Sequence, residues 1–363
     1  MKPIIVSALA TVVLAFYAFS GNTTVSKNDP VSIAVEKGAK WLVSTQGKDG
    51  GWGQDGGETS YVRAGERLES NGNDVANTAV AAAALLHSGS TPLTGEYHES
   101  LARAVNYILD HVESSSSDNL EVTTLHGTQI QRKLGPYIDT FLTSKLLAEL
   151  DGTMGDAKQN ARVRRALEKC VAKIEKNQMK DGSWNFAGGW APILGTSMAS
   201  RTLDMAKRKG VAVSTGSMAK VKDYTANTVA SPAPTSAAAG VPLYQRAQAL
   251  EQMSRTESDR ATNAPQIKAM KAELSDTKFV MGFGSFGGEE FFSYLNISDS
   301  LHRTGGPEWQ KWNSDIKAKL VTLQNQDGTW AGHHCITGRV AVTSAAILVM
   351  LVDKEPVPDS KKS

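Results

Sequence analysis

The sequence predicts an all-α protein in which six helical hairpins close into two concentric rings, an (α/α)6 toroid. Three observations support this prediction. A seven-residue pattern occurs three times, helical segments of two types alternate along the chain, and apolar residues make up 40% of the composition. With 363 residues and 21% charged residues, the chain has ordinary globular composition and is long enough to bury a sizeable core.

The repeated pattern is Gln-x-x-Asp-Gly-x-Trp, and each copy ends a helical segment. The copies are QGKDGGW (46–52), QMKDGSW (178–184) and QNQDGTW (324–330). An Asp-Gly pair after apolar residues at helix spacing predicts a helix end and a tight turn, because glycine adopts positive φ at little steric cost. Each Trp is then expected to fold back onto the helix that has just ended.

The helical segments alternate between an amphipathic type and an apolar type rich in small residues. The amphipathic segments, expected to form the outer ring, are 31–46, 97–112, 158–177, 215–228, 260–276 and 308–325. The apolar segments, expected to form the inner ring, are 74–88, 136–150, 193–208, 241–254, 288–302 and 337–352. A helix that is apolar all round is buried on both sides, and Ala, Ser and Thr allow close packing. No segment has the polar outer face of a capping repeat, so a closed ring is favoured over an open solenoid.

The first twenty residues are predicted to be a signal peptide. Lys2 precedes an apolar run from Ile4 to Phe19, and small residues precede a cleavage site near Ser20. The alternative is an uncleaved anchor, which would be the protein's sole membrane contact, although the run is short for a span. The chain is accordingly expected to be exported, either to a periplasm or to the medium.

Charge and cysteine content narrow the possible classes of function. The domain is assigned to residues 30–353 and a charged tail to residues 354–363. The net charge is +2 without a dense basic cluster, so nucleic-acid binding is not expected. Two cysteines so far apart as Cys170 and Cys335 do not make a disulfide scaffold. Cys170 lies in the helical pattern ALEKCVAKI and is expected to be a buried small hydrophobe.

The three repeats, with KGAKWLVSTQ before the first, resemble the QW repeats of squalene and hopene cyclases. They also resemble the related repeats of protein prenyltransferase β subunits. The resemblance covers nearly the whole chain after its first segment and implies the (α/α)6 toroid. It also implies an isoprenoid-like ligand in the central cavity, although a shared fold does not determine activity.

Motifs that carry the chemistry of these families are missing from the sequence. The Asp-x-Asp-Asp acid of class II cyclases does not occur, nor does the Asp-rich metal motif of class I terpene synthases. The chain is also too short to hold the second helical domain of squalene-type cyclases. Protein prenyltransferases hold zinc with Asp, Cys and His, of which Asp and Cys are close in sequence, and Cys335 has no Asp so near.

The candidate site is the mouth of the ring, where the N-termini of the inner helices converge and favour anions or polarised groups. The candidate catalytic residues there are Asp74, Asp139, Glu289, Glu290, His334, Cys335 and Arg339. The candidate ligand-binding residues are the aromatics Tyr137, Trp190, Tyr244 and Phe291. An acid facing a confined apolar cavity is expected to have a raised pKa and could act as a general acid. The alternative for each acid is a helix cap or a first-turn acid that stabilises the helix dipole.

The segment GHHCITGR (332–339) is the densest cluster of reactive side chains. If it is extended, His333 and Cys335 point the same way and could share a zinc ion, whereas His334 would need a turn to join them. Three ligands therefore require a distant partner. The candidates for that partner are Glu289, Glu290 and Asp74.

Two other interpretations of this segment remain open. One is a metal-free polar site of His334, Cys335 and Arg339. In that site Arg339 would pair with Glu289 or Glu290, and a nearby cation and the helix dipole would lower the pKa of Cys335. The other is a hydrogen-bonded loop packed against the tryptophan of the third repeat.

Three hypotheses for function follow, and the sequence leaves open whether the protein is an enzyme. The first is an exported toroid that binds, and in one version transforms, an apolar isoprenoid-like ligand. The second is a non-catalytic interaction module that uses the surface of the ring. The third is a carbohydrate-active enzyme of the α/α-barrel type, which would need paired carboxylates across an open cleft. Zinc is the one cofactor for which the sequence offers ligands, and the oligomeric state does not follow from it.

Overall fold

The computed structural model describes residues 29–56, 72–184, 186, 192–230, 241–276 and 287–355. Side chains are described within these ranges except for residues 192–194, 229–230 and 241–244. The predicted signal peptide, Trp190 and the side chain of Tyr244 lie outside the described residues. Within the described ranges, no helix is long and apolar enough to cross a membrane.

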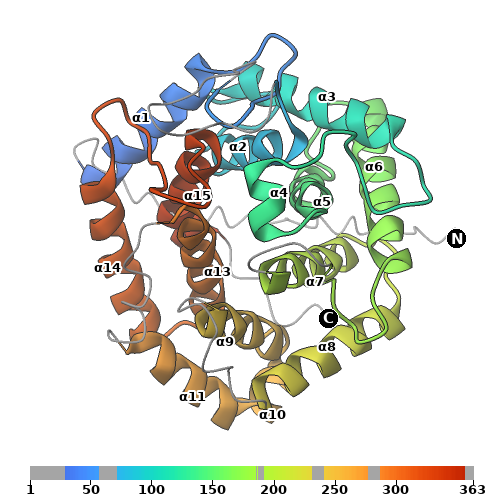
Figure 1. The fold of residues 1–363 in the computed structure, drawn as a ribbon, viewed down its shortest axis with the longest axis vertical. Coiled ribbons are helices and arrows are strands. Elements are labelled where there is room, and N and C mark those ends of the chain that lie inside the picture. The colour runs from blue at the N-terminus through green and yellow to red at the C-terminus, as the bar shows by residue number, and fades with distance from the viewer. Residues whose placement is uncertain are drawn as a thin grey trace, which may run out of the picture.

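The helices form two concentric rings around a common axis (Figure 1). The inner ring consists of α2 (Val75–His87), α5 (Ile138–Leu150), α7 (Pro192–Arg208), α9 (Val241–Met253), α13 (Gly288–Thr304) and α15 (Arg339–Leu351). The outer ring consists of α1 (Pro30–Ser44), α3 (His98–Ser114), α6 (Ala157–Lys176), α8 (Thr215–Ala230), α11 (Ala264–Ser275) and α14 (Pro307–Leu323). The prediction of an all-α toroid with alternating outer and inner helices is confirmed.

Short elements complete the two rings. The helix α4 (Gln129–Leu134) precedes α5, and the 3-10 helix η2 (Val352–Lys354) follows α15. The fifth outer element was expected as one helix over 260–276, but it is divided into α10 (Glu257–Thr262) and α11. A proline lies at the start of α11, where its missing N–H costs no helical hydrogen bond and its fixed φ starts a new helix.

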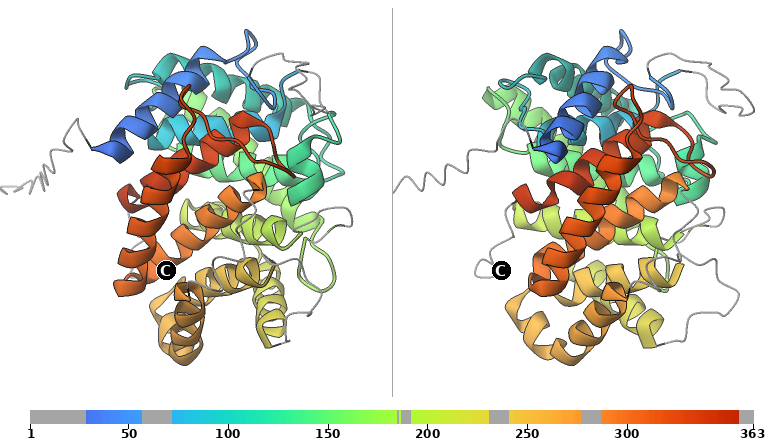
Figure 2. Two further views of the ribbon diagram at one scale, coloured as in Figure 1. Left: turned by 60° about the vertical axis from the view of Figure 1, so that its left-hand side comes forward. Right: turned by 90° about the vertical axis from the view of Figure 1, so that its left-hand side faces the viewer.

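The ring is closed by contacts between its first and last helices. Each inner helix contacts the next, and α15 contacts α2, so that the inner ring has no free edge. On the outside α14 contacts α1. The side views in Figure 2 show the last outer and inner helices lying beside the first hairpin.

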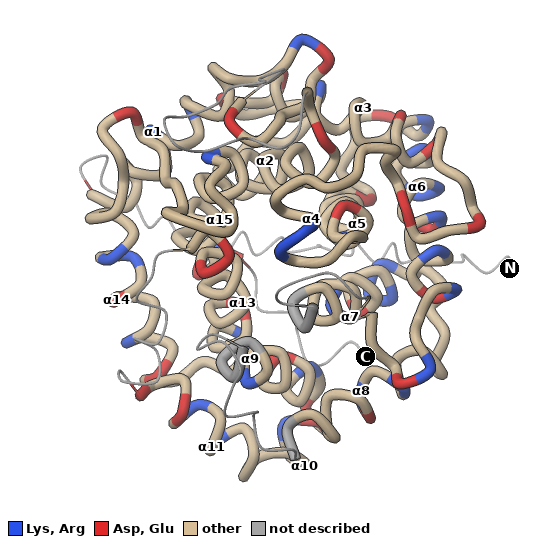
Figure 3. The backbone as a smooth tube through the Cα atoms, in the orientation of Figure 1, with Lys and Arg blue, Asp and Glu red and all other residues tan. Residues whose placement is uncertain are grey.

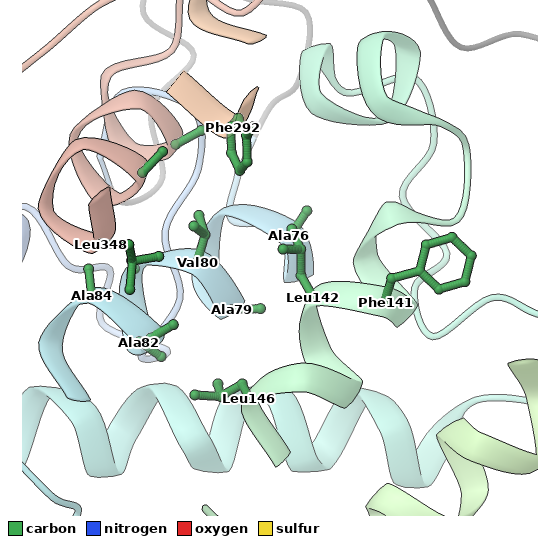
Figure 4. Close-up of a cluster of buried hydrophobic side chains, with 14 of the residues drawn as sticks. Ala76, Ala79, Val80, Ala82, Ala84, Phe141, Leu142, Leu146, Phe292 and Leu348 are labelled. Carbon is green, nitrogen blue, oxygen red and sulfur yellow. The ribbon is translucent and has the colours of Figure 1, made fainter. Parts of the chain in front are cut away.

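The inner helices are buried on all sides, as their composition predicts. Every residue of α15 from Val340 to Leu351 is buried, and so is every residue of α2 from Val75 to Leu85. Figure 4 shows alanines of α2 beside larger side chains from α5, α13 and α15. Small residues on α2 therefore let the neighbouring helices approach closely and place their bulky side chains against it.

The first repeat joins three helices through its Gln and Trp side chains. Trp52 is fully buried, and its Nε1 donates to the carbonyl of Leu42 at 2.8 Å. The backbone N–H of Trp52 donates to Thr78 Oγ1 on α2 at 2.9 Å. Gln46 Nε2 donates to the carbonyl of Ser100 on α3 at 2.9 Å. One repeat thus fixes the end of an outer helix, the start of its inner partner and the start of the next outer helix.

The other two repeats make the same hydrogen bonds. Trp184 and Trp330 donate through Nε1 to the helix that each has left, and through the backbone to a threonine of the inner helix. In the third repeat, Gln324 Nε2 donates to the carbonyl of Ala34 on α1 at 2.8 Å. Gly328 has a φ of 89°, and a Cβ there would lie 2.9 Å from the carbonyl oxygen of Lys37. In each repeat the Gln side chain donates to a carbonyl of the next outer helix, and in the last repeat that helix is α1, so this hydrogen bond closes the ring.

The first two residues of the predicted tail, residues 354 and 355, contact the ring, and the rest of it lies outside the described residues. Lys354 belongs to η2, and Glu355 lies 3.0 Å from His87 Nδ1 of α2. The described part of the predicted tail is therefore bound to the last turn of an inner helix. Cys170 is buried and free on α6, as expected for a small hydrophobe.

Candidate functional site

The mouth of the ring brings together the starts of the inner helices and the loop that follows the third repeat. In Figure 3 acidic residues mark the starts of α5 and α13, and basic residues mark α4. All of the predicted catalytic residues belong to this end of the ring because each lies at or just before the start of an inner helix. Their individual roles differ.

Asp74 is the N-cap of α2. A capping role was the alternative to a catalytic role that the sequence left open for this residue. Its Oδ1 accepts the backbone N–H of Asn77 at 2.8 Å, and its Oδ2 accepts Asn77 Nδ2 at 2.8 Å. The carboxyl group is buried, with 1% of the residue exposed. Burial, with the neighbouring charge of Asp139, raises the pKa of Asp74 to about 7.

Asp139, in the first turn of α5, links three helices. Its Oδ1 accepts the backbone N–H of Ala76 on α2 at 3.1 Å, and its Oδ2 accepts Gln131 Nε2 on α4 at 2.8 Å. Burial raises the pKa of Asp139 to about 6. The hydrogen-bond donors to Asp74 and Asp139 are neutral amides, so they offset only part of the desolvation cost. The two acids form a coupled pair that binds protons near neutral pH.

Glu289 and Glu290 lie in the first turn of α13, and both are buried. Glu290 accepts a hydrogen bond from Tyr294 one turn later, at 3.2 Å. Tyr294 in turn accepts a hydrogen bond from Lys319 Nζ of α14 at 3.1 Å. Glu289 faces the loop before α15, and its Oε2 has no hydrogen-bond partner among the described residues. Glu290 is thus tied to the core, and Glu289 is the acid available to the mouth.

The loop before α15 is fixed by a buried glutamine. Gln129 Oε1 accepts the backbone N–H groups of Thr337 and Gly338 at 3.0 and 3.1 Å. On its other side, the N–H of Gly288 donates to the carbonyl of His334 at 3.2 Å. A Cβ at Gly332 would lie 2.2 Å from a backbone oxygen of the same loop. The loop therefore has little freedom to move against α4 and α13.

The loop turns sharply at Cys335, which has a φ of 63°. This turn brings His334 Nδ1 to 3.1 Å from Cys335 Sγ and to 4.0 Å from Glu289 Oε1. One ligand atom from each of the three residues lies within 4.8 Å of the other two. The sequence grouped His333 with Cys335 on the basis of an extended loop. The structure groups His334 with Cys335 instead, because the loop is turned at this residue.

The prediction of a lowered pKa for Cys335 is wrong. Burial and the adjacent Glu289 carboxylate raise the pKa of the Cys335 thiol, and Lys133 of α4 opposes this in part. The sequence placed a cation and a helix N-terminus beside the thiol, but the combined effect of burial and the acid of α13 exceeds that of the cation.

The predicted pairing of Arg339 with Glu289 or Glu290 is also wrong. Arg339 Nε lies 3.2 Å from Asp55 Oδ1, and its Nη1 lies 3.0 Å from Asp327 Oδ2. The guanidinium also lies over the ring of Trp41, 5.1 Å from its centroid. The side chain therefore points outward from α15 and joins the turns of the first and third repeats. Arg339 stabilises the ring and does not face the mouth acids.

A narrow cavity, partly open to solvent, lies between the inner helices and offers about 40 Å³ of space to the centre of a water molecule. Its apolar lining includes Val80, Phe141, Leu142, Phe292, Leu295 and Leu348. Its polar lining consists of Lys145, Ser197, Arg201, Asn296 and Asp299. Figure 4 shows several of the apolar lining residues around α2. The cavity is therefore apolar over most of its wall and charged at one end.

The aromatic residues expected to line the cavity lie elsewhere or outside the described side chains. Phe291 packs in the core beside Tyr294, with ring centroids 5.9 Å apart, and its neighbour Phe292 lines the cavity. Tyr137 packs edge-on against Phe186, with centroids 4.8 Å apart. Trp190 and the side chain of Tyr244 are not described.

The polar end of the cavity was missed by the sequence analysis. Arg201 forms a buried ion pair with Asp299, and Ser197 donates to Asn296 Oδ1 at 3.3 Å. Among the described residues, Arg201 Nε and Asn296 Nδ2 are buried donors without a hydrogen-bond partner. The available signal was the presence of charged residues such as Arg201 within otherwise small or apolar helical segments.

Beyond the cavity, the far end of the ring is a network of ion pairs, formed by the last turns of the inner helices and by Glu355. His87 lies 3.1 Å from Glu149, and Lys145 lies 2.5 Å from the same carboxylate. The charges of Glu149 and Glu355 raise the pKa of His87 to about 10, against the opposing effect of burial. The residue is therefore a buried cation at neutral pH.

Comparison with known proteins agrees with this architecture. Residues 12–130, about a third of the chain, match the squalene-hopene cyclase C-terminal domain family. A solved structure of a type II terpene cyclase from Scytonema, in complex with its substrate geranylgeranyl dihydroxybenzoate, superposes with a TM-score of 0.50 at 14% identity. The match covers 90% of this chain and 97% of the cyclase. A search of curated proteins by sequence gave no match.

The shared fold extends over nearly the whole of both chains, and the family match includes the first repeat and the start of α2. The chain has a closed inner ring, three repeat turns that make the same hydrogen bonds, and a central cavity with a largely apolar wall. The chain is an α/α toroid that resembles the type II terpene cyclase in fold, and its first third matches the squalene-hopene cyclase C-terminal domain family.

Proposed function

We propose that the toroid binds an isoprenoid-like ligand, with an apolar body and an oxygen atom at one end, in its central cavity. The observation that carries the proposal is the division of the cavity wall. Side chains such as Phe292 and Leu348 line most of the wall. At its polar end, two buried donors, Arg201 Nε and Asn296 Nδ2, have no hydrogen-bond partner among the described residues. A buried donor without a partner costs about 1–3 kcal/mol, so a ligand oxygen placed there would recover part of this cost.

Uptake of a fluorescent prenyl alcohol by the purified chain tests this proposal. Saturable binding is expected with a dissociation constant of about 1 μM, or about −8 kcal/mol. Met198 lines the cavity from α7, and Met198→Trp should block uptake by filling it. Met205 lies two turns later on the same helix, is also half-buried and does not line the cavity, so Met205→Trp is the matched control. Equal uptake by the two variants, or no saturable uptake by the unchanged chain, would refute the proposal.

The polar end of the ligand can be tested separately. Asn296→Leu removes a donor from the cavity wall while keeping a side chain of similar size. It should weaken binding of the prenyl alcohol and leave binding of a prenyl hydrocarbon unchanged. Equal losses for both ligands would show that Asn296 acts by shape alone.

We infer further that the bound ligand is transformed by proton transfer. The coupled acids Asp74 and Asp139 support this inference, since their raised pKa values keep a proton at the mouth near neutral pH. The resemblance to class II cyclases implies protonation of an alkene, and these acids would replace the missing tetrapeptide. Incubation with polyprenes followed by mass spectrometry should give an isomeric product that Asp139→Asn abolishes. Unchanged polyprene in every incubation would limit the function to binding.

Export is proposed on the basis of the first segment of the sequence. The run from Ile4 to Phe19 and the small residues before Gly21 support cleavage near Ser20. Intact-mass measurement of protein recovered from a secreting host should show the loss of this segment. An intact N-terminus in a membrane fraction would favour the anchored alternative.

A further inference from the structure

We propose that Glu289, His334 and Cys335 bind a zinc ion at the mouth of the ring, with one coordination position left open. The proposal does not depend on what the central cavity binds. A carboxylate, an imidazole and a thiolate are all zinc ligands, and a mixed set of this kind suits zinc better than magnesium or calcium. Three protein ligands with one open position are typical of catalytic zinc sites.

The distances between the ligand atoms fit a single ion. His334 Nδ1 lies 3.1 Å from Cys335 Sγ and 4.0 Å from Glu289 Oε1. Tetrahedral zinc with bonds of about 2.0–2.3 Å places its ligand atoms roughly 3.3–3.8 Å apart. The two measured distances lie on either side of this range, so small side-chain rotations would bring all three atoms to one ion.

The backbone is bent in a way that creates this convergence. Cys335 has a φ of 63°, a left-handed conformation that costs a non-glycine residue about 1–2 kcal/mol. The consequence is that the side chains of residues 334 and 335 meet each other, whereas neighbouring side chains of an extended loop point apart. Gln129 and Gly288 hold the loop in this form through backbone hydrogen bonds. Strain of this kind is maintained where the surrounding structure fixes it, and it is frequent at functional sites.

The buried acid supports a cation rather than a hydrogen-bonded site. Glu289 has 2% of its surface exposed, and its Oε2 has no hydrogen-bond partner in the described part of the chain. A buried carboxylate oxygen without a donor is costly, and a metal ion would supply the missing charge.

A catalytic triad of Cys, His and acid is the main alternative, and the geometry disfavours it. In a triad, the nucleophile and the acid contact opposite nitrogens of the imidazole. Here the sulfur of Cys335 and the carboxylate of Glu289 both lie nearest to Nδ1 of His334. Convergence on one nitrogen is the arrangement expected around a shared ion.

The proposed site lies next to the central cavity. Phe292 follows Glu289 by one turn on α13 and lines the cavity wall. The open coordination position would therefore be available to a polar group at the mouth end of that cavity. The ligand set also differs from the one implied by the prenyltransferase resemblance, because its acid and its thiol are far apart in sequence and come from two different inner-helix starts.

Metal content and cobalt spectroscopy of the full chain test the proposal. After loading with zinc and dialysis, the protein should retain about one equivalent of zinc. Loading with cobalt should give a thiolate-to-cobalt charge-transfer band that Cys335→Ser removes. Glu289→Gln and His334→Ala should each weaken zinc binding by at least about tenfold.

Each of these variants has a matched control in the same chain. The controls are Glu290→Gln, His333→Ala and Cys170→Ala, which change the same residue types outside the cluster. They should retain zinc and the cobalt spectrum. Circular dichroism of the metal-free variants would show whether any of them has lost the fold, and Glu289→Gln keeps the size of the side chain it replaces. Absence of bound zinc in the unchanged chain, or equal loss in His333→Ala and His334→Ala, would overturn the proposal.

Discussion

The two ends of the inner ring differ in their electrostatics. At the mouth, burial raises the pKa of Asp74 to about 7 and that of Asp139 to about 6. At the far end, the charges of Arg255 and Arg303 outweigh burial and hold the pKa of Glu251 at about 2. Glu355, which is half-buried there, has its pKa lowered to about 2 by His87 against the effect of burial.

The difference lies in the partners of these acids, because Asp74, Asp139 and Glu251 are all buried to the same degree. The donors to the mouth acids are neutral amides, whereas each far-end acid contacts a cation. The mouth therefore holds exchangeable protons, and the far end holds fixed charges that join neighbouring helices. This separation suits a ring whose chemistry is proposed at one end and whose rigidity is supplied by the other.

The largest expected effect comes from breaking the far-end network. Glu251→Gln leaves Arg255 and Arg303 buried without the carboxylate that they share, at 2.7 and 3.8 Å. Removing one partner of a buried ion pair costs about 3–5 kcal/mol. Urea denaturation should show a loss of this size in the free energy of unfolding.

The matched control for this variant is an ion pair on the surface. Lys311 and Asp315 form an exposed pair on α14, so Asp315→Asn should change stability very little. A Glu251→Gln variant as stable as Asp315→Asn would contradict the view that fixed charges hold the far end together.

A smaller effect is expected from the pH dependence of the mouth. Between about pH 4 and pH 7 the folded chain holds protons on Asp74 and Asp139 that the unfolded chain has released. The free energy of unfolding should therefore fall as pH rises through this window. The far-end acids act in the opposite sense, since their stabilisation is lost as pH falls below about 4 towards 2.

The variant Asp74→Asn should reduce the dependence between pH 4 and pH 7. Asparagine is an equally good N-cap, and its amide can donate to Asn77 Oδ1, which has no partner in the described structure. Stability should thus be kept at low pH and improved near neutral pH. An unchanged slope in urea denaturation across this pH range would count against a raised pKa at Asp74.

The smallest expected effect comes from placing a cation beside one of the mouth acids, as the far-end acids already have. Gln131 Nε2 lies 2.8 Å from Asp139 Oδ2, so Gln131→Lys places a charge beside this acid. The pKa of Asp139 should fall by about 1–3 units. Gln131→Met, which removes the hydrogen bond without adding charge, should raise it. Stability measured against pH separates the two variants, and shifts in the same direction would show that polarity alone sets the pKa.

The fold could be predicted from the sequence because its signals are local. The turn at Asp327-Gly328 and the return of Trp330 onto α14 depend on residues within one repeat. The spacing of apolar residues also indicates which helical segments are buried on all sides. This pattern was enough to assign α2 and α15 to the inner ring. The divided fifth outer element was missed because the pattern runs through the proline that starts α11.

The site was less predictable because its contacts cross the ring. The sequence showed that Arg339 begins the last inner helix. It could not show that its partner is Asp55, which belongs to a turn near the other end of the chain. Whether His333 or His334 lies beside the Cys335 thiol depends on the φ angle of Cys335. A positive φ at a residue other than glycine is uncommon, and the sequence gives no sign of it. Periodicity shows that a side chain is buried, and it does not show which residue of another hairpin it meets.

The joint between α14 and α1 has a consequence for how the chain could be rearranged. Gln324 bonds to α1 as Gln46 bonds to α3, so the ring has no structural beginning or end. Asp29 and Lys354 line the same surface groove, which places the two ends of the domain near each other. A short linker between them, with a new break in the exposed loop after α3, would give a circular permutant with the same rings. In such a chain the joint between α14 and α1 would become local, and the joint between α3 and α6 would span the whole chain in its place, so the folding rate should change little.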